Sequence, residues 1–300
     1  DYLHTNVDGI WAVGDAIAVK HFVSGEQTII PLASPANKQA RIVADNIKGR
    51  KVKYNGTQGT SIAKVFDMTV ASTGLTEKDC IRLGIDYHKS FSATDSHAGY
   101  YPGPTMMTVK LLYTKGEGKV LGGQIVGYKG VDKRIDILAV AIRAGMTVFD
   151  LHQLELAYAP PFSSAKDPIN MAGYVGENVV LGESKIATFE EVMAMGDEVI
   201  KLDVRTEAEC AKGMVPGFIN IPLHLLRERY TELDKSKPVY IHCQSGLRAY
   251  VGERILSNLG FNCYNIFGSW MWYNMWQADL QAKAAENEIT SNCARPEFNA

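Results

Sequence analysis

Cysteine is scarce in this chain of 300 residues, and its five copies are widely separated: Cys80, Cys210, Cys243, Cys263 and Cys293. An odd and scattered set forms neither a disulfide framework nor a Cys-x-x-Cys metal pair, so we expect no metal site. Long apolar runs are also missing, and we expect neither a membrane span nor a signal peptide. These absences predict a cytoplasmic protein in a reducing compartment.

A dominant charge of either sign is missing as well. The net charge is −2 at pH 7, and no basic cluster is present, which argues against nucleic acid as a main partner. Hydrophobic residues make up 46% of the chain, enough for two globular domains that each bury a core. The chain begins at Asp1 without a methionine, and we expect it to be the interior of a longer protein.

The most informative stretch spans residues 239–249. A short apolar strand ends at Cys243, a loop with Ser245 and Gly246 follows, and apolar residues then recur at helical spacing from Arg248. Backbone N–H groups converge where a strand meets a helix N-terminus, and the helix dipole there stabilises a thiolate and lowers its pKa. We predict that this cysteine is a nucleophile; the alternative is an inert core residue.

The Cys-x4-Arg spacing after an apolar strand resembles the active loop of the rhodanese family, whose cysteine carries a persulfide sulfur cradled by backbone amides. The related phosphatase cradle, Cys-x5-Arg, needs one more residue, and position 249 is alanine. The resemblance implies that Cys243 and Arg248 are catalytic. It also implies a persulfide loop formed by Gln244, Ser245, Gly246, Leu247 and Ala249.

Residues 184–280 as a whole resemble a single rhodanese domain. Thr188 and Glu191 form a capping box at the start of a short helix, and a strand leads to Asp203 and Arg205, which we expect to form an ion pair that supports the loop. Alternating strands and helices predict a parallel α/β sheet with the cysteine at a carboxyl edge. We expect packing roles for three tryptophans, then a helix from Gln277 and a loose tail over 281–300; the tryptophans are Trp270, Trp272 and Trp276.

Residues 5–15 predict a turn and a buried strand that ends in Gly-Asp. This resembles the second flavin fingerprint of the pyridine nucleotide-disulfide oxidoreductases, in which the aspartate binds the ribityl chain of FAD. Residues 31–47 predict a loop with a proline near the helix start and then an amphipathic helix, whose N-terminus in that family points at the flavin. The resemblance implies that residues 1–50 end an FAD-binding domain and that Asn37 lies near substrate, although it could be a plain helix cap. The implied FAD-binding residues are Thr5, Gly14, Asp15, Ala33 and Tyr158.

Residues 51–182 predict an α+β domain, with strand-like patterns at 61–71, 86–93, 105–113 and 120–127 and helices at 76–83, 132–143 and 169–180. This order resembles the dimerisation domain of the disulfide reductases and implies a homodimer. The family's usual His-x4-Glu pair is missing from the chain.

Two tyrosine motifs, Tyr-Tyr-Pro-Gly and Ala-Tyr-Ala-Pro-Pro, resemble instead the coenzyme A-disulfide reductase branch. The resemblance implies that Tyr100 and Tyr158 are catalytic at the partner subunit's active site, where a phenol can hydrogen-bond a thiolate. Tyr101 is an equal rival of Tyr100, and simple packing is the alternative for all three. Lys166 is placed near coenzyme A phosphate, or is a solvated lysine.

Together these motifs resemble the C-terminal half of the coenzyme A-disulfide reductase–rhodanese fusions, with mixed α/β and α+β domains. The resemblance implies FAD- and NAD(P)H-dependent reduction of coenzyme A disulfides, persulfides or polysulfides, coupled to sulfur transfer through a cysteine persulfide. The Gly-x-Gly-x-x-Gly motif and the redox cysteine that should face the flavin are missing from these residues. The alternative is therefore a dimeric binding module whose rhodanese domain only accepts or carries sulfane sulfur. NADH or NADPH, the substrate, and the direction of sulfur transfer stay open.

Overall fold

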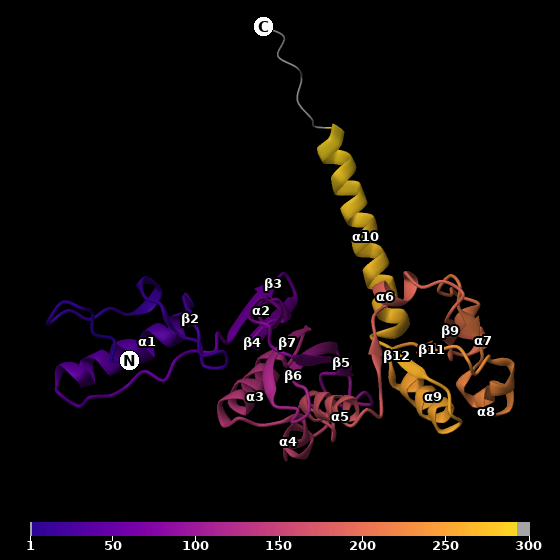
Figure 1. The fold of residues 1–300 in the computed structure, drawn as a ribbon, viewed down its shortest axis with the longest axis horizontal. Coiled ribbons are helices and arrows are strands. Elements are labelled where there is room, and N and C mark those ends of the chain that lie inside the picture. The colour runs from indigo at the N-terminus through magenta and orange to yellow at the C-terminus, as the bar shows by residue number, and fades with distance from the viewer. Residues whose placement is uncertain (1, 293–300) are drawn as a thin grey trace, which may run out of the picture. The chain divides into compact units, whose positions relative to one another are not determined.

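The computed structural model describes residues 2–292, which divide into two compact units with the boundary between Val180 and Leu181 (Figure 1). The first unit begins with a 3-10 turn, η1 (Gly14–Ala16), a two-stranded antiparallel ribbon of β1 (Val19–Lys20) and β2 (Gln27–Thr28), and helix α1 (Ala33–Ile47).

The prediction of a buried strand before Gly14 is wrong. Trp11 makes a single bridge with His4, and Ile10 is exposed. Among residues 2–292 no further strand pairs with this segment, so its apolar residues do not join a sheet.

A five-stranded antiparallel sheet forms the centre of the first unit. Its strands follow the order β3 (Ser61–Val65), β4 (Met68–Gly74), β7 (Val120–Gly127), β6 (Met106–Thr114) and β5 (Tyr87–Asp95). The single strand expected over 61–71 is instead a hairpin that turns at Phe66, whose φ of 52° is left-handed. The strand-like alternation of side chains continues through the turn, because both strands of the hairpin belong to the same sheet.

Helices cover one face of this sheet. α3 (Val131–Ala144) and α5 (Pro168–Val180) pack on it, and α4 (Val148–Gln153) packs against α5. α2 (Glu77–Leu83), whose capping box begins at Thr76, lies on the opposite face, where its Cys80 packs with Leu112 and Leu121. The core between helices and sheet includes Val109, Leu111, Ile125, Leu138 and Ile169. Side chains of the other parity point away from this core: Val70 and Val126 face each other across β4 and β7 and are each 38% exposed.

The second unit is a parallel α/β fold, as predicted. Its five strands follow the order β10 (Ile219–Asn220), β9 (Ile200–Asp203), β11 (Val239–His242), β12 (Cys263–Ile266) and β8 (Ile186–Ala187). Its short helices are α6 (Phe189–Met193), which has the predicted capping box, α7 (Glu207–Cys210) and α8 (Leu226–Arg229), followed by the longer α9 (Leu247–Asn258). All four residues of β11 are buried, so this central strand presents residue 243 at the middle of its carboxyl edge.

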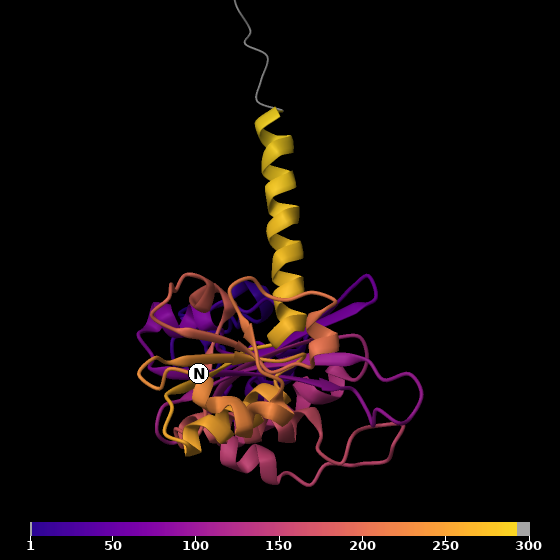
Figure 2. The ribbon, with the colours of Figure 1, turned by 90° about the vertical axis from the view of Figure 1, so that its right-hand side faces the viewer.

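The last helix, α10 (Ser269–Asn292), begins against this sheet and extends well beyond it (Figures 1 and 2). Trp270, Trp272 and Trp276 pack against a core cluster around Phe189, as the sequence predicted. Residues 281–292 are therefore helical rather than a tail, while 293–300, with Cys293, lie outside the described residues. Within the described part, no helix combines the length and apolar character that crossing a membrane requires.

Candidate functional site

The sulfur of Cys243 lies in a loop that directs a backbone amide at it. Cys243 follows β11 and is 1% exposed, and the N–H of Gly246 donates to its Sγ at 3.1 Å. Gly246 precedes α9 with a φ of 121°, a conformation that favours glycine. A Cβ at this position would meet no atom within 4 Å, so the requirement is for backbone conformation and not for space.

The first turn of α10 anchors this loop. The N–H of Cys243 donates to Ser269 Oγ at 3.0 Å, and the Ser269 hydroxyl donates to Sγ at 3.7 Å. The N–H of Trp270 donates to the Cys243 carbonyl at 2.9 Å, and that of Met271 to the Gln244 carbonyl at 3.1 Å. The sequence analysis assigned no role to Ser269, although a serine three residues after β12, the strand beside β11, lies at the same sheet edge as the cysteine.

Arg248 lies at the start of α9 and forms a two-pronged ion pair with Glu209. Its Nη1 and Nη2 donate to the two carboxylate oxygens at 2.8 and 2.7 Å. Glu209 also accepts from the N–H of Thr206 in the capping box of α7. The hydrogen bonds from Arg248 hold the pKa of Glu209 below its usual range, so the carboxylate stays ionised. Sequence reasoning missed Glu209; its only sequence signal is the Thr-x-x-Glu capping pattern.

A buried polar group supports the loop from beneath. Arg205 Nη2 donates to Asp203 Oδ2 at 2.7 Å, which is the predicted ion pair, and the guanidinium lies 4.2 Å from the Trp270 ring centroid. His242 Nε2 lies 3.3 Å from the same carboxylate oxygen without forming a hydrogen bond, and its Nδ1 lies 3.1 Å from the Cys243 carbonyl oxygen. Burial lowers the pKa of His242 to about 4, so this imidazole is neutral at pH 7.

The other described cysteines have environments that disfavour a thiolate. Burial raises the pKa of Cys263 to about 12, and burial together with the Asp203 carboxylate raises that of Cys210 to about 11. Burial also raises the pKa of Cys80. These three thiols are therefore protonated at neutral pH and are weak nucleophiles.

In the first unit, two tyrosines from distant loops meet. The hydroxyls of Tyr100 and Tyr158, 58 residues apart, lie 2.7 Å from each other. Both side chains face solvent, with exposed fractions of 77% and 46%. The ring of Tyr101 instead contacts the His97 ring edge to face at 5.8 Å. The structure thus distinguishes the two neighbouring tyrosines by their contacts.

Arg134 holds the loops of both tyrosines. This buried guanidinium, 1% exposed, donates through Nη2 to Asp167 Oδ2 at 2.9 Å, to the Ser96 carbonyl at 3.0 Å and to Ser163 Oγ at 3.1 Å. Burial opposes ionisation of Asp167, but hydrogen bonds from Arg134, the amide of Ile169 and Ser163 outweigh it and lower its pKa. The ion pair therefore connects the loop before Tyr100 with the loop after Tyr158.

The remaining predicted residues lie in three separate surroundings. Lys166 is exposed, and its Nζ lies 5.7 Å from the Tyr174 ring centroid. Thr5 is engaged in its own turn, where its hydroxyl donates to the Ile10 carbonyl at 3.0 Å. The N–H of Gly14 donates to Gln39 of α1 at 2.7 Å, which brings the exposed carboxylate of Asp15 beside this helix.

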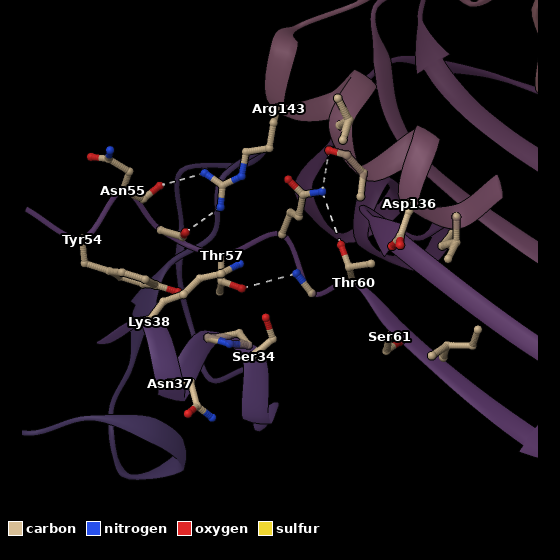
Figure 3. A pocket seen from close by; sticks show the side chains of 18 of the residues that line it. Ser34, Asn37, Lys38, Tyr54, Asn55, Thr57, Thr60, Ser61, Asp136 and Arg143 are labelled. Carbon is tan, nitrogen blue, oxygen red and sulfur yellow. Dashed lines mark hydrogen bonds between the residues drawn. The ribbon is translucent and has the colours of Figure 1, made fainter. Parts of the chain in front are cut away.

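A cavity of about 1180 Å³ lies between α1, the segment 53–62 and α3 (Figure 3). Asn37 borders it from α1, and Asp136 and Arg143 border it from α3. Asn37 donates to the Ala33 carbonyl at 2.9 Å from within the helix, so it is not a cap. Tyr100 and Cys243 are not among the residues that line this cavity.

Two family models match these two units. The pyridine nucleotide-disulphide oxidoreductase dimerisation domain matches residues 60–168, and the rhodanese-like domain matches residues 188–275. The chain joins an oxidoreductase dimerisation domain to a rhodanese domain. The second match places the Cys243 loop within the rhodanese domain, and the first places both tyrosines within the dimerisation domain.

Solved fusions of similar architecture match most of the chain. Reduced Bacillus anthracis CoADR-RHD is 48% identical with a TM-score of 0.84, over 88% of this chain and 48% of that one. The NAD-dependent persulfide reductase from A. fulgidus is 36% identical with a TM-score of 0.83, over 91% of this chain and 50% of that one. The chain is homologous to these fusions.

A curated relative, the coenzyme A disulfide reductase of Staphylococcus aureus (strain bovine RF122 / ET3-1), is 40% identical over 176 residues, 58% of this chain and 40% of the relative. The NAD(P)H sulfur oxidoreductase (CoA-dependent) of Pyrococcus furiosus is 36% identical over 56% of this chain and 38% of that protein. The chain thus spans about two fifths of the length of the curated relatives that it matches.

The residues around Gly14 fit one edge of a flavin site. No side chain of the described residues caps α1, so the positive end of its dipole is available to an electron-rich group. The exposed carboxylate of Asp15 next to it is an acceptor for sugar-like hydroxyls. Thr5 does not contribute to this edge through its hydroxyl, which its own turn occupies.

A first prediction concerns the tyrosine pair of the dimerisation domain. The hydrogen bond with Tyr100 raises the pKa of Tyr158, so Tyr100→Phe should lower it toward the ordinary value of about 10. The measurement is a pH titration by NMR of chains carrying tyrosine labelled with ¹³C at Cζ. Tyr101→Phe is the matched control and should leave the Tyr158 titration unchanged. An unshifted Tyr158 in Tyr100→Phe would contradict the pairing.

Proposed function

We propose that the rhodanese domain, residues 184–280, transfers sulfane sulfur through a persulfide on Cys243. The observation that carries this proposal is the Gly246 amide, which donates to Sγ at 3.1 Å within a loop held by α10. The Cys243 thiolate attacks the sulfane sulfur of a donor, a new S–S bond forms, and the donor leaves with the electron pair of the broken bond. Gln244, Ser245, Leu247 and Ala249 shape the loop, and Arg248 supplies its cation.

We propose in addition that the dimerisation domain, residues 51–182, serves an FAD- and NAD(P)H-dependent reductase of coenzyme A disulfides, persulfides or polysulfides. Support comes from the names of the relatives and from the Tyr100–Tyr158 pair, whose exposed hydroxyls suit a leaving thiolate. Lys166, also exposed, would pair with coenzyme A phosphate.

Residues 1–50 would form the end of the FAD-binding domain in this proposal. Asp15 would accept hydrogen bonds from ribityl hydroxyls, the start of α1 at Ala33 would face the ring, and Asn37 would lie on the substrate side. FAD would pass electrons from NAD(P)H to the sulfur substrate. Having both activities in one chain raises the effective concentration of the transferred sulfur.

The reductase proposal is tested with a protein in which this chain is joined to the FAD- and NAD(P)H-binding region of such a reductase. It should purify with flavin and oxidise NADH or NADPH when coenzyme A disulfide, a persulfide or a polysulfide is added. Tyr158→Phe should slow this oxidation, while Tyr101→Phe should not. A flavin-loaded protein that oxidises neither nucleotide with any of these substrates would contradict the reductase proposal. It would favour the alternative, a binding module without reductase activity. Sulfur transfer is tested separately by replacing Cys243.

A second prediction concerns the sheet face of the first unit that lies opposite α3 and α5, where Val70 and Val126 are exposed. We infer that two copies dimerise through this face, because Val70 and Val126 present paired apolar side chains there. Val70→Asp buries a charge in such an interface and should shift the chain from dimer to monomer in light scattering. Val140→Asp, which makes the same change at an exposed site on α3, on the other side of the sheet, is the control and should stay dimeric. A wild-type monomer would contradict the inference.

A further inference from the structure

The mouth of the rhodanese loop has almost no net side-chain charge. Residues 244–247 are Gln, Ser, Gly and Leu, so Arg248 is the only cation of the loop. The carboxylate of Glu209 accepts hydrogen bonds from both terminal nitrogens of Arg248, at 2.8 and 2.7 Å. The two side chains are 32% and 31% exposed, so the pair lies at the surface and not in the core.

Arg248 is close enough to the reacting sulfur for its charge to matter. It lies two residues after Gly246, whose N–H donates to Cys243 Sγ at 3.1 Å. The hydrogen bond with Glu209 is the main cause of the raised pKa of Arg248. A free guanidinium in this place would attract anionic donors in proportion to their charge. When the guanidinium is paired with Glu209, a dianionic donor gains little electrostatic attraction from it.

We propose that Glu209 is a specificity-determining residue that neutralises Arg248 and so disfavours sulfur donors whose sulfane group belongs to a dianion. The loop is then selective for donors that carry at most one negative charge at the sulfane group, such as an organic persulfide. This inference rests on the proposed sulfur transfer by Cys243. It goes beyond that proposal because it assigns the choice of donor to a residue of α7, 39 positions away from Arg248 in the sequence.

Two sulfur donors with similar chemistry and different charge test this proposal. Thiosulfate is a dianion and methanethiosulfonate a monoanion, and each carries its sulfane sulfur on an oxidised sulfur atom. In both cases the Cys243 thiolate attacks the sulfane sulfur, the Cys persulfide forms, and the electron pair of the broken S–S bond leaves on sulfite or on methanesulfinate. Cyanide then takes the outer sulfur as thiocyanate and regenerates the thiolate, so thiocyanate reports each turnover.

The variant Glu209→Gln removes the charge and preserves the structure. Glutamine serves at the third position of a capping box, so the cap from Thr206 persists, and its carbonyl still accepts from Arg248. Glu207→Gln makes the same change in charge two residues earlier in α7, at an exposed position. It is the matched control.

Glu209→Gln should raise kcat/KM for thiosulfate about tenfold at low ionic strength, and high salt should remove most of this gain. The value for methanethiosulfonate should rise only about threefold, because a monoanion gains half as much electrostatic free energy from the unmasked cation as a dianion does. Glu207→Gln should change neither value.

An unchanged value for thiosulfate in Glu209→Gln would overturn the proposal. Equal gains for both donors would also overturn it, because Glu209 would then act on the thiolate and not on the donor. A wild-type chain that turns over neither donor and gains no sulfur at Cys243 would instead overturn the proposed function itself. The two failures are thus distinguishable.

Discussion

Replacing Cys243 by serine should abolish sulfur transfer by the rhodanese domain, with a loss of about a thousandfold or more. A serine hydroxyl is not ionised at neutral pH and cannot hold a persulfide sulfur, whereas the loop around Cys243 aims an amide at the sulfur. Two measurements check this result. Thiocyanate formation from a persulfide donor and cyanide should disappear, and the mass increase of one sulfur atom should be found at Cys243 in the wild type.

The matched control is Cys210→Ser. Cys210 is more exposed than Cys243, but burial and its contact with Asp203 raise its pKa to about 11. This variant should keep most of the wild-type activity. Brief alkylation of the wild type should label Cys243 first, and preferential labelling of Cys210 or Cys263 would contradict the assignment of the loop.

Replacing Arg134 by methionine should destabilise the first unit by about 3–5 kcal/mol, because it leaves Asp167 buried without its cation. Both residues are 1% exposed and share two hydrogen bonds through Nε in addition to the one through Nη2. Urea unfolding followed by circular dichroism measures the change. Arg143→Met, on the same helix, is the control: that exposed guanidinium donates to the carbonyls of Asn55 and Gly56, and its loss should cost about 1 kcal/mol.

The destabilisation caused by Arg134→Met should depend on pH in a defined direction. The pKa of Asp167 is lowered in the folded chain, so at a given acidic pH this carboxyl group binds fewer protons in the folded chain than in the unfolded chain. The stability that it contributes is fully present above the unfolded pKa of about 3.9 and is lost as the pH falls through the folded value. Arg134→Met should lose its stability difference from the wild type as acid is added. A difference that grows toward low pH would contradict the role of the ion pair.

Local pattern was enough to predict the loop of Cys243 and most of the two sheets. The strand before Cys243 is short, apolar and followed by helical spacing, and all of that information is contiguous. The failures concern features that depend on distant partners. Residues 10–13 are apolar enough for a strand but form none, because strand formation needs a neighbour that sequence pattern does not reveal. The turn at Phe66 was missed because phenylalanine rarely adopts a left-handed conformation.

The site residues show the same division. Arg248 followed from its spacing to the cysteine, but Glu209 lies 39 positions away, and its capping pattern says nothing about a second partner. The sequence could not separate Tyr100 from Tyr101, because adjacent residues share composition and turn. Their different partners, Tyr158 for one and the His97 ring for the other, arise from chain segments that meet only in the fold.

The attachment of the Cys243 loop to α10 sets a limit on how this domain can be engineered. Ser269 holds the loop through its hydroxyl, and Trp270 and Met271 hold it through their backbone N–H groups, so a cut before α10 would remove this support and leave the strand and the cysteine in place. The tryptophan cluster that seats this helix reaches Trp276. A portable sulfur-transfer module for grafting onto another carrier protein must therefore run from Leu181 through at least Trp276, with the rest of α10 available as a place to attach a linker.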